Sequence, residues 1–410
     1  MFKILIFLLS INSFDSKKNK LINKIDSIIE YSIKEKAFPG AQIIVLKDGE
    51  EVVNKNYGYH TYDSVIKVNQ NSIYDLASIT KPTAGAIALM KLYENNLLDL
   101  NKPLSHYINF FNNTRVGDVL IKNYLQHISG IRPWIPFHST TKKENGKYKR
   151  KTLSYKPKKR YNIKLTESLY LFKNYKKEIY NQIKETYFID SDTVLYSGLF
   201  FYLIPEIVEI QTNQSFDKYV ENLFSSMNLN SILFNPTKKF DLETIVPTES
   251  DNFFRNFQIH GFVHDEGAAM MDGISANAGL FSNASNLSKV YQMFLENGYV
   301  NGKKYLDNNV INLFTQYNNE NEKFYRGLGF DKPKPVYDID KCTYSKYSSD
   351  LSFGHSGYTG TFFWVDPKYN LIYVFLSNRV YDSRDNRKIY DLNVRTNIHD
   401  LIYENLIEID

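Results

Sequence analysis

The first sixty residues combine one segment of helical spacing with two segments of strand spacing. Apolar residues recur every three or four positions over residues 21–33, which predicts an amphipathic helix. Two short runs rich in apolar and β-branched residues follow at 41–46 and 51–57. Because Asp48 and Gly49 separate these runs, and Asp-Gly is a preferred hairpin turn, we predict two adjacent antiparallel strands.

The middle of the chain has mainly helical spacing. Residues 78–98 predict a helix in which Pro82 is tolerated because it falls in the opening turns, so Ser78 should lie at a helix N-terminus. Residues 196–210 also predict a helix, which Pro205 should kink. Ser215 is a suitable N-cap for a further helix at 216–224.

Strand spacing returns near the C-terminus. Residues 361–365 and 371–377 predict two strands joined by a turn, and residues 394–406 predict a last helix. Strands at both ends with a mainly helical middle favour one antiparallel sheet, built from the two ends of the chain, with a helical insertion between them.

Composition narrows the class of protein. A chain of 410 residues with 43% apolar residues can bury a full core, and its net charge of +5 implies neither nucleic-acid nor membrane binding. Cys342 is the single cysteine, which excludes an intrachain disulfide framework and a multi-cysteine zinc site. The strongly basic stretch at 140–160 is expected to be a solvated surface insertion rather than a contact for an anionic polymer.

The N-terminus carries an ambiguous targeting signal. Residues 1–16 contain Lys3, a short apolar run and then small polar residues, a pattern that resembles a secretory signal more than a membrane span. Export to the periplasm or cell envelope is one reading. An ordinary apolar N-terminus on a cytoplasmic protein is the other.

The first candidate for chemistry is the segment Ser78-Ile79-Thr80-Lys81. Side chains three positions apart share a helix face, so Ser78 and Lys81 can meet. A hydroxyl needs a base to become a nucleophile, and a partly desolvated lysine can serve as that base. Ser78 alone would equally well be an N-cap, because that is the usual role of a serine before a helix.

This segment resembles the first signature of the serine β-lactamase and penicillin-binding-protein superfamily. Five further stretches resemble later signatures of the superfamily and its class C-like branch, and they occur in the family's order. Together the resemblance covers roughly residues 21–402. The stretches are Leu125-Gln126-His127-Ile128-Ser129-Gly130-Ile131, Tyr196-Ser197-Gly198, Gly261-Phe262-Val263-His264-Asp265-Glu266, Ala278-Gly279-Leu280-Phe281-Ser282 and His355-Ser356-Gly357. The chain is also similar to the domain that follows a β-N-acetylglucosaminidase domain in some bacteria, from which no glycosidase activity is carried over.

The resemblance implies an α/β fold of the β-lactamase type, with an antiparallel sheet flanked by helices and an inserted all-helical lobe. Residues 17–410 would form this single domain, with the sheet part at about 20–76 and 280–410 and the lobe at about 77–279. The active site would lie in the cleft between the two parts.

The resemblance also implies roles for individual residues. Ser78 would attack an acyl carbon while Lys81 and Tyr196 share its proton, which leads to an acyl-enzyme. The backbone N–H groups of Ser78 and Tyr358, beside Gly357, would form the oxyanion hole. His355 would support the site electrostatically or bind a substrate carboxylate.

Two positions depart from the family's pattern. Gly198 replaces an asparagine that in relatives holds the amide side of a β-lactam or peptide, and His355 replaces a lysine. A histidine is only partly charged near neutral pH, so carboxylate capture should be weaker. An efficient β-lactamase is therefore disfavoured, which leaves an esterase, a D-amino-acid peptidase or a weak β-lactamase, without a cofactor or metal.

Three other interpretations stay open at this point. The chain could be a non-catalytic scaffold that binds cell-wall fragments or a partner. It could be a metallohydrolase using His260, His264, Asp265 and His355, although Gly261 stands where a zinc protease has its catalytic glutamate. His127 could be structural, and His264 and Asp265 a loop hydrogen-bond pair. The expected partner is a small-molecule or peptide substrate, with cell-wall material as a further candidate; the sequence leaves the oligomeric state unknown.

Overall fold

A five-stranded antiparallel sheet forms the base of the molecule. The computed structural model describes residues 2–190, 192–317 and 323–408, with side chains from residue 16 onward. The strand order is β13-β14-β15-β1-β2, so the two ends of the chain share one sheet. Its strands are β1 (Gly40–Lys47), β2 (Glu50–Gly58), β13 (Phe353–Ser356), β14 (Phe362–Asp366) and β15 (Leu371–Ser377). The two predicted strand pairs are confirmed.

The register of the central pair joins the termini. Ala41 lies opposite Ser377 and Lys47 opposite Leu371, so β1 and β15 are paired along almost their whole length. Asp48 and Gly49 make the predicted hairpin turn, with φ values of 53° and 82°. Both residues therefore adopt the left-handed conformation that a two-residue hairpin of this kind requires.

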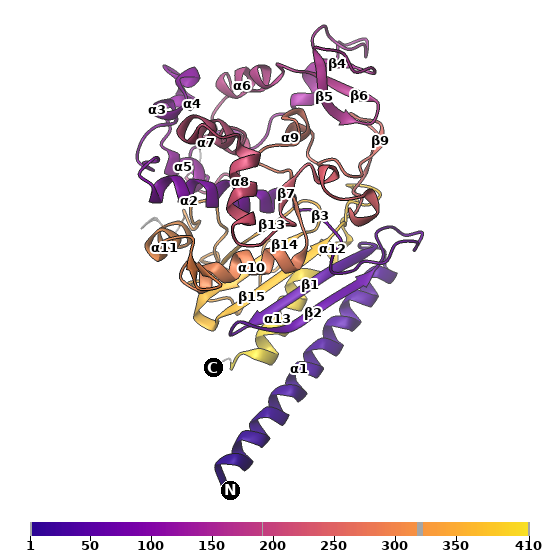
Figure 1. Cartoon of the computed structure of the whole chain (residues 1–410), viewed down its shortest axis with the longest axis vertical. Coiled ribbons are helices and arrows are strands. Elements are labelled where there is room, and N and C mark those ends of the chain that lie inside the picture. The colour runs from indigo at the N-terminus through magenta and orange to yellow at the C-terminus, as the bar shows by residue number, and fades with distance from the viewer. Residues whose placement is uncertain (1, 191, 318–322, 409–410) are drawn as a thin grey trace.

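Helices cover both faces of the sheet (Figure 1). On one face α1 (Phe2–Lys34) packs beside α13 (Val394–Leu406), and on the other lies α10 (Ala284–Leu295). Alternate residues of β1 divide between the two cores: Ile43 and Val45 belong to the core under α1 and α13, and Ile44 and Leu46 to the larger core beneath the lobe. This alternation is the two-residue period of a strand buried on both faces.

The lobe above α10 is mainly helical. The helices of the lobe and of the connections around it are α2 (Ile87–Glu94), α3 (Leu104–Tyr107), α4 (Arg115–Asp118), α5 (Ile121–Leu125), α6 (Lys176–Lys184), α7 (Ile204–Thr212), α8 (Phe216–Ser225), α9 (Glu266–Met270), α11 (Asn308–Thr315) and α12 (Lys388–Asp391).

The expectation of an all-helical lobe is wrong. A small sheet of order β4-β6-β5 lies within and beside the basic stretch, formed by β4 (Leu153–Ser154), β6 (Leu169–Phe172) and β5 (Tyr161–Thr166). A second sheet pairs β3 (Tyr74–Asp75), β10 (Leu280–Ser282) and β7 (Leu233–Phe234). Two-stranded pairs join β8 (Ser250–Asp251) to β9 (Phe257–Gln258) and β11 (Tyr299–Val300) to β12 (Lys303–Lys304).

Two local expectations also need correction. Pro205 does not kink a helix, because it occupies the first turn of α7, where the missing N–H would have no intrahelical partner. Ser215 is the N-cap residue of α8, but its hydroxyl donates to Asp217 at 2.6 Å instead of accepting from the helix backbone. Within the ranges that the model describes, we find no helix with both the length and the apolar character of a membrane span.

Candidate active site

Ser78 lies in a tight turn at the start of the lobe's first helical run. The turn Ala77–Ile79 is 3₁₀-helical, the turn Lys81–Ala86 is π-helical, and α2 continues from it. Ala77 has φ = 47°, a left-handed conformation that costs energy for a residue other than glycine. Ser78 keeps partial exposure, whereas its two neighbours are buried. The chain thus presents one hydroxyl from an otherwise enclosed turn.

A buried carboxylate holds this turn in place. One oxygen of Asp75 accepts the N–H of Ala77 at 2.8 Å, and the other accepts the N–H of His264 at 2.6 Å. Burial raises the pKa of Asp75 above its ordinary value, and the two N–H groups oppose that shift. Asp75 therefore ties the turn that carries Ser78 to a loop almost two hundred residues away in the sequence.

Lys81 is directed at Ser78. Its Nζ lies 2.9 Å from Ser78 Oγ and 2.9 Å from the backbone oxygen of Asn277. The side chain is only 2% exposed, and its Nζ lies 5.4 Å from the ring centroid of Tyr196 and 5.6 Å from that of Phe201. None of the ion pairs found in the described part of the chain includes Lys81. The contact that the spacing predicts is present.

Tyr196 reaches the same place from the loop before the 3₁₀ turn Leu199–Tyr202. Its ring is 39% exposed and lies 4.6 Å from the ring of His127 and 5.9 Å from that of His355, between centroids. His127 accepts the N–H of Ser197 at 3.1 Å, and burial holds its pKa well below the usual range. A neutral His127 thus helps to hold Tyr196 in place, through the hydrogen bond to Ser197 and the contact between the two rings.

The sheet contributes the turn that follows β13. Thr359 Oγ1 donates to the backbone oxygen of Asp75 at 2.8 Å, and Thr361 Oγ1 donates to that of Leu76 at 3.0 Å. A side chain at Gly357 would lie 2.0 Å from Thr361 Oγ1 and 2.5 Å from the oxygen of Leu76. Glycine is required here because the two backbones approach so closely. The turn holds the half-exposed Tyr358 beside the Ser78 turn.

His355 is buried, and it is not the partly charged side chain that its residue type suggested. It is 3% exposed, its Nδ1 lies 2.8 Å from the backbone oxygen of Ser356, and burial lowers its pKa to about 4. It is therefore uncharged at neutral pH. The positive charge nearby is the guanidinium of Arg326, which forms an ion pair with Asp331 and lies 5.6 Å from the Tyr196 ring centroid.

The residues of the metallohydrolase interpretation do not form a metal site. His260 Nε2 lies 2.7 Å from the backbone oxygen of Ile245, and Asp265 caps α9. In the described ranges, the one group of metal-type ligands is formed by Glu249, Asp251 and Glu266. Two buried or half-buried guanidinium groups neutralise these carboxylates: Arg255 donates to Asp251 at 2.8 Å, and Arg384 pairs with both glutamates.

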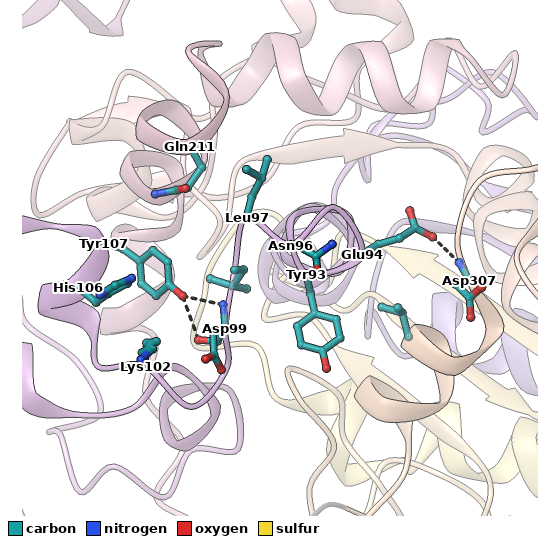
Figure 2. A pocket seen from close by; sticks show the side chains of 12 residues that line it. Tyr93, Glu94, Asn96, Leu97, Asp99, Lys102, His106, Tyr107, Gln211 and Asp307 are labelled. Atoms are coloured by element: carbon teal, nitrogen blue, oxygen red, sulfur yellow. Dashed lines mark hydrogen bonds between the residues drawn. The ribbon is translucent and has the colours of Figure 1, made fainter.

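An open pocket elsewhere in the lobe contains none of the candidate residues. It has a volume of 740 Å³ and is bounded by the C-terminal end of α2 and by α3 and α11 (Figure 2). Two of its polar side chains are already engaged, because Tyr107 bonds to the backbone of Asp99 and Glu94 accepts the N–H of Asp307 at 2.6 Å. We therefore place no chemistry there.

Several residues at the site were not predicted. Asp75, Tyr202, Asn277 and Arg326 stand next to the Ser78, Lys81 and Tyr196 group, but only folding brings them there. Two of these residues could have been suspected from the sequence, because Asp75 and Asn277 lie within three residues of stretches that resemble family signatures.

The antiparallel sheet, the inserted lobe and the Ser78–Lys81 pair at their junction define the architecture of the serine β-lactamases and penicillin-binding proteins. A family model described as Beta-lactamase matches residues 25–396, and the chain belongs to that family.

Curated relatives and solved structures agree with this assignment. The N-acetylmuramyl-L-alanine amidase of Bacillus subtilis (strain 168) is 29% identical over 92% of this chain and 86% of its own length. A protein of Salmonella typhi named "Putative D-alanyl-D-alanine carboxypeptidase" is likewise 29% identical, with the same coverage. Among solved structures, the hydrolase EstCE1 has a TM-score of 0.67 at 14% identity, covering 93% of this chain and 99% of its own. A class C β-lactamase has a TM-score of 0.65 at 15% identity, covering 95% and 99%.

Proposed function

We propose that this chain is a serine acyl hydrolase that works through an acyl-enzyme on Ser78. The observation that carries the proposal is the 2.9 Å hydrogen bond between Lys81 Nζ and Ser78 Oγ. This geometry is the one that a nucleophile and its base require, and a half-exposed Ser78 can meet a substrate.

The proposed reaction has two steps. Ser78 Oγ attacks the acyl carbon, its proton passes to Lys81 or Tyr196, and the leaving group departs with a proton from the same pair. Water then attacks the ester on Ser78 and releases a carboxylic acid. The backbone N–H groups of Ser78 and Tyr358 are the proposed donors to the developing oxyanion, where one donor contributes about 3 to 4 kcal/mol.

The substrate class that we propose is an acylated D-amino acid or peptide of the cell wall, with simple esters as accessible surrogates. The names of two relatives refer to muramyl-alanine and D-alanyl-D-alanine bonds, which supports this class. A neutral His355 makes strong capture of a β-lactam carboxylate less favourable. Action on the cell wall would require export, which stays a prediction.

The direct test is covalent labelling. Wild-type protein and Ser78→Ala are incubated with a fluorophosphonate or a fluorescent penicillin, and the intact mass of each is measured. We expect one added mass on the wild type and none on Ser78→Ala, because only an activated hydroxyl displaces the leaving group.

A matched control variant is Ser225→Ala, which removes an exposed hydroxyl at the end of α8. It should be labelled at the wild-type rate. If the folded wild type takes up neither probe, the hydrolase proposal fails, and the non-catalytic scaffold becomes the better account of the chain.

A further inference from the structure

The room left by Gly198 is occupied by another residue. A side-chain carbon placed on Gly198 would lie 2.3 Å from Oδ1 of Asn277, which is closer than two such atoms can approach. Asn277 lies seventy-nine residues further along the chain, just before the strand β10. The carboxamide that the Tyr196-Ser197-Gly198 segment lacks is therefore supplied from a different part of the sequence.

Asn277 is also bound directly to the catalytic pair. Its backbone oxygen accepts the hydrogen bond from Lys81 Nζ at 2.9 Å, and its own N–H donates to Ser275 Oγ at 3.1 Å. The residue is 7% exposed, so the positions of its Oδ1 and Nδ2 atoms are constrained by the residues packed around them. A displacement of the Asn277 backbone would therefore change the position of Lys81 Nζ.

The orientation of the carboxamide follows from its neighbours. Tyr202 has a single hydroxyl proton, and it donates that proton to Asp265 at 2.9 Å, because the carboxylate can only accept. The same Tyr202 oxygen lies 3.1 Å from Nδ2 of Asn277 and must therefore accept a hydrogen from it. This fixes Nδ2 towards Tyr202 and leaves Oδ1 on the side of Gly198.

Oδ1 is free to act as an acceptor. Among the residues that the structure describes, no hydrogen bond to Oδ1 is found, and Oδ1 is not one of the side-chain atoms that are buried without a partner. An accessible carbonyl oxygen next to Gly198 and Lys81 prefers an N–H group over an oxygen, because two acceptors repel each other.

We propose that Asn277 is the residue that contacts the amide of the substrate, and that it selects acyl groups with an N–H next to the scissile carbonyl. The inference rests on the proposed function and adds a specificity to it. The preferred acyl donors are N-acylated amino acids, bound through their N–H, and Gly198 is needed so that the Asn277 side chain can lie where it does.

The test compares two thioesters that differ in one atom. N-acetyl-D-alanyl thioester carries the N–H, and (R)-2-acetoxypropionyl thioester has an oxygen in its place. Thiol release gives kcat/KM for each. We expect the wild type to prefer the first by about tenfold, the usual size of one neutral hydrogen bond and its repulsive replacement.

Four variants test whether the preference comes from Asn277. Asn277→Ala should bring the ratio of the two kcat/KM values to within about twofold of unity, because the acceptor is gone. Gly198→Ala should do the same by displacing the carboxamide, and Gly198→Ala with Asn277→Ala should have no additional effect on the ratio. Asn277→Asp keeps an acceptor oxygen and should keep the preference. Gly302→Ala, where nothing lies within 4 Å of the added carbon, is the matched glycine control.

The rate of phosphonylation of Ser78 by a fluorophosphonate separates the possible failures. That probe has no amide, so its rate measures how much general reactivity each variant loses, and the ratio of the two thioesters is compared between variants independently of that loss. A wild-type ratio near one, or a preference that survives both Asn277→Ala and Gly198→Ala, overturns the inference. No phosphonylation of the wild type would instead overturn the proposed function.

Discussion

The surroundings of Lys81 agree with its proposed role as the base for Ser78. Its two hydrogen bonds go to a hydroxyl and to a backbone oxygen, and two aromatic rings enclose the rest of the side chain. A carboxylate partner would hold the ammonium in its charged form. No such partner is found among the ion pairs of the described residues, and Nζ is directed at Ser78 Oγ.

Removing the amine should therefore abolish most of the reactivity. We expect Lys81→Met to lower the rate of Ser78 phosphonylation by about 10²-fold or more, the usual contribution of a positioned base. The rate is followed by intact mass against time. Lys218→Met removes an exposed lysine of α8 that pairs with Glu221 and should change nothing. Equal rates for wild type and Lys81→Met would exclude Lys81 as the base.

At the scale of elements, the site depends on one close contact between the lobe and the sheet. The turn after β13 contacts the Ser78 turn through hydrogen bonds from Thr359 and Thr361, and through the close approach of the Gly357 backbone. This contact fixes the distance between the two backbone N–H groups proposed for the oxyanion. The proposed oxyanion hole therefore depends on how these two elements pack against each other.

A methyl group at this contact should disturb the docking. In Gly357→Ala the new carbon would lie 2.5 Å from the backbone oxygen of Leu76, so the turn must move away from Ser78. We expect at least a tenfold slower phosphonylation, because an oxyanion donor is worth about 10² to 10³ in rate. Gly146→Ala, which has no neighbour within 4 Å, should react normally. Unchanged labelling in folded Gly357→Ala would show that Tyr358 plays no part.

Regular elements were predictable where the local pattern agreed with the final packing. The Asp48-Gly49 hairpin and the helix α13 were found from the sequence because turn chemistry and apolar spacing are local properties. The strands β5 and β6 were missed, because their position beside a run of lysines hides the alternation. Pro205 was misread because its effect depends on whether it opens a helix or interrupts one.

The contacts of the candidate site likewise divide into local ones, which the sequence predicts, and long-range ones, which it does not. The Ser78–Lys81 contact spans three residues, and helical geometry alone predicts it. The bond from Lys81 to Asn277 spans 196 residues and that from Asp75 to His264 spans 189, so only the folded chain brings these pairs together. The division into a sheet part and a lobe at residues 77 and 279 stays a prediction.

At the scale of the whole molecule, several histidines are buried in their neutral form. Burial lowers the pKa of His60 and His355 to about 4 and that of His399 to about 3, against an ordinary value of 6.5. The ring of His399 lies among Phe362, Tyr373 and Tyr403, which offer no charge to offset a proton. Each of these histidines can be protonated far more easily in the unfolded chain.

This arrangement should make the fold sensitive to mild acid. Well above pH 6.5 the histidines are neutral in both the folded and the unfolded chain, and they cost no stability. As the pH falls from 6.5 towards 4, these histidines bind protons in the unfolded chain but stay neutral in the folded chain, so the free energy of unfolding decreases. The loss is about 1 kcal/mol for each histidine between pH 6.5 and 5.5. Glu249, whose pKa is lowered to about 2, adds a further loss below pH 4.5.

Urea unfolding at pH 7.5, 6.5 and 5.5 measures the effect. The wild type should lose about 4 kcal/mol between the last two values, from His60, His127, His355 and His399 together. His399→Gln retains an acceptor for the N–H of Ser345 and should lose roughly one quarter less, whatever its stability at pH 7.5. His106→Gln, which alters an exposed ring, should follow the wild type. A free energy of unfolding that is constant from pH 7.5 to 5.5 would mean that these histidines gain solvent or a counter-charge in the folded protein.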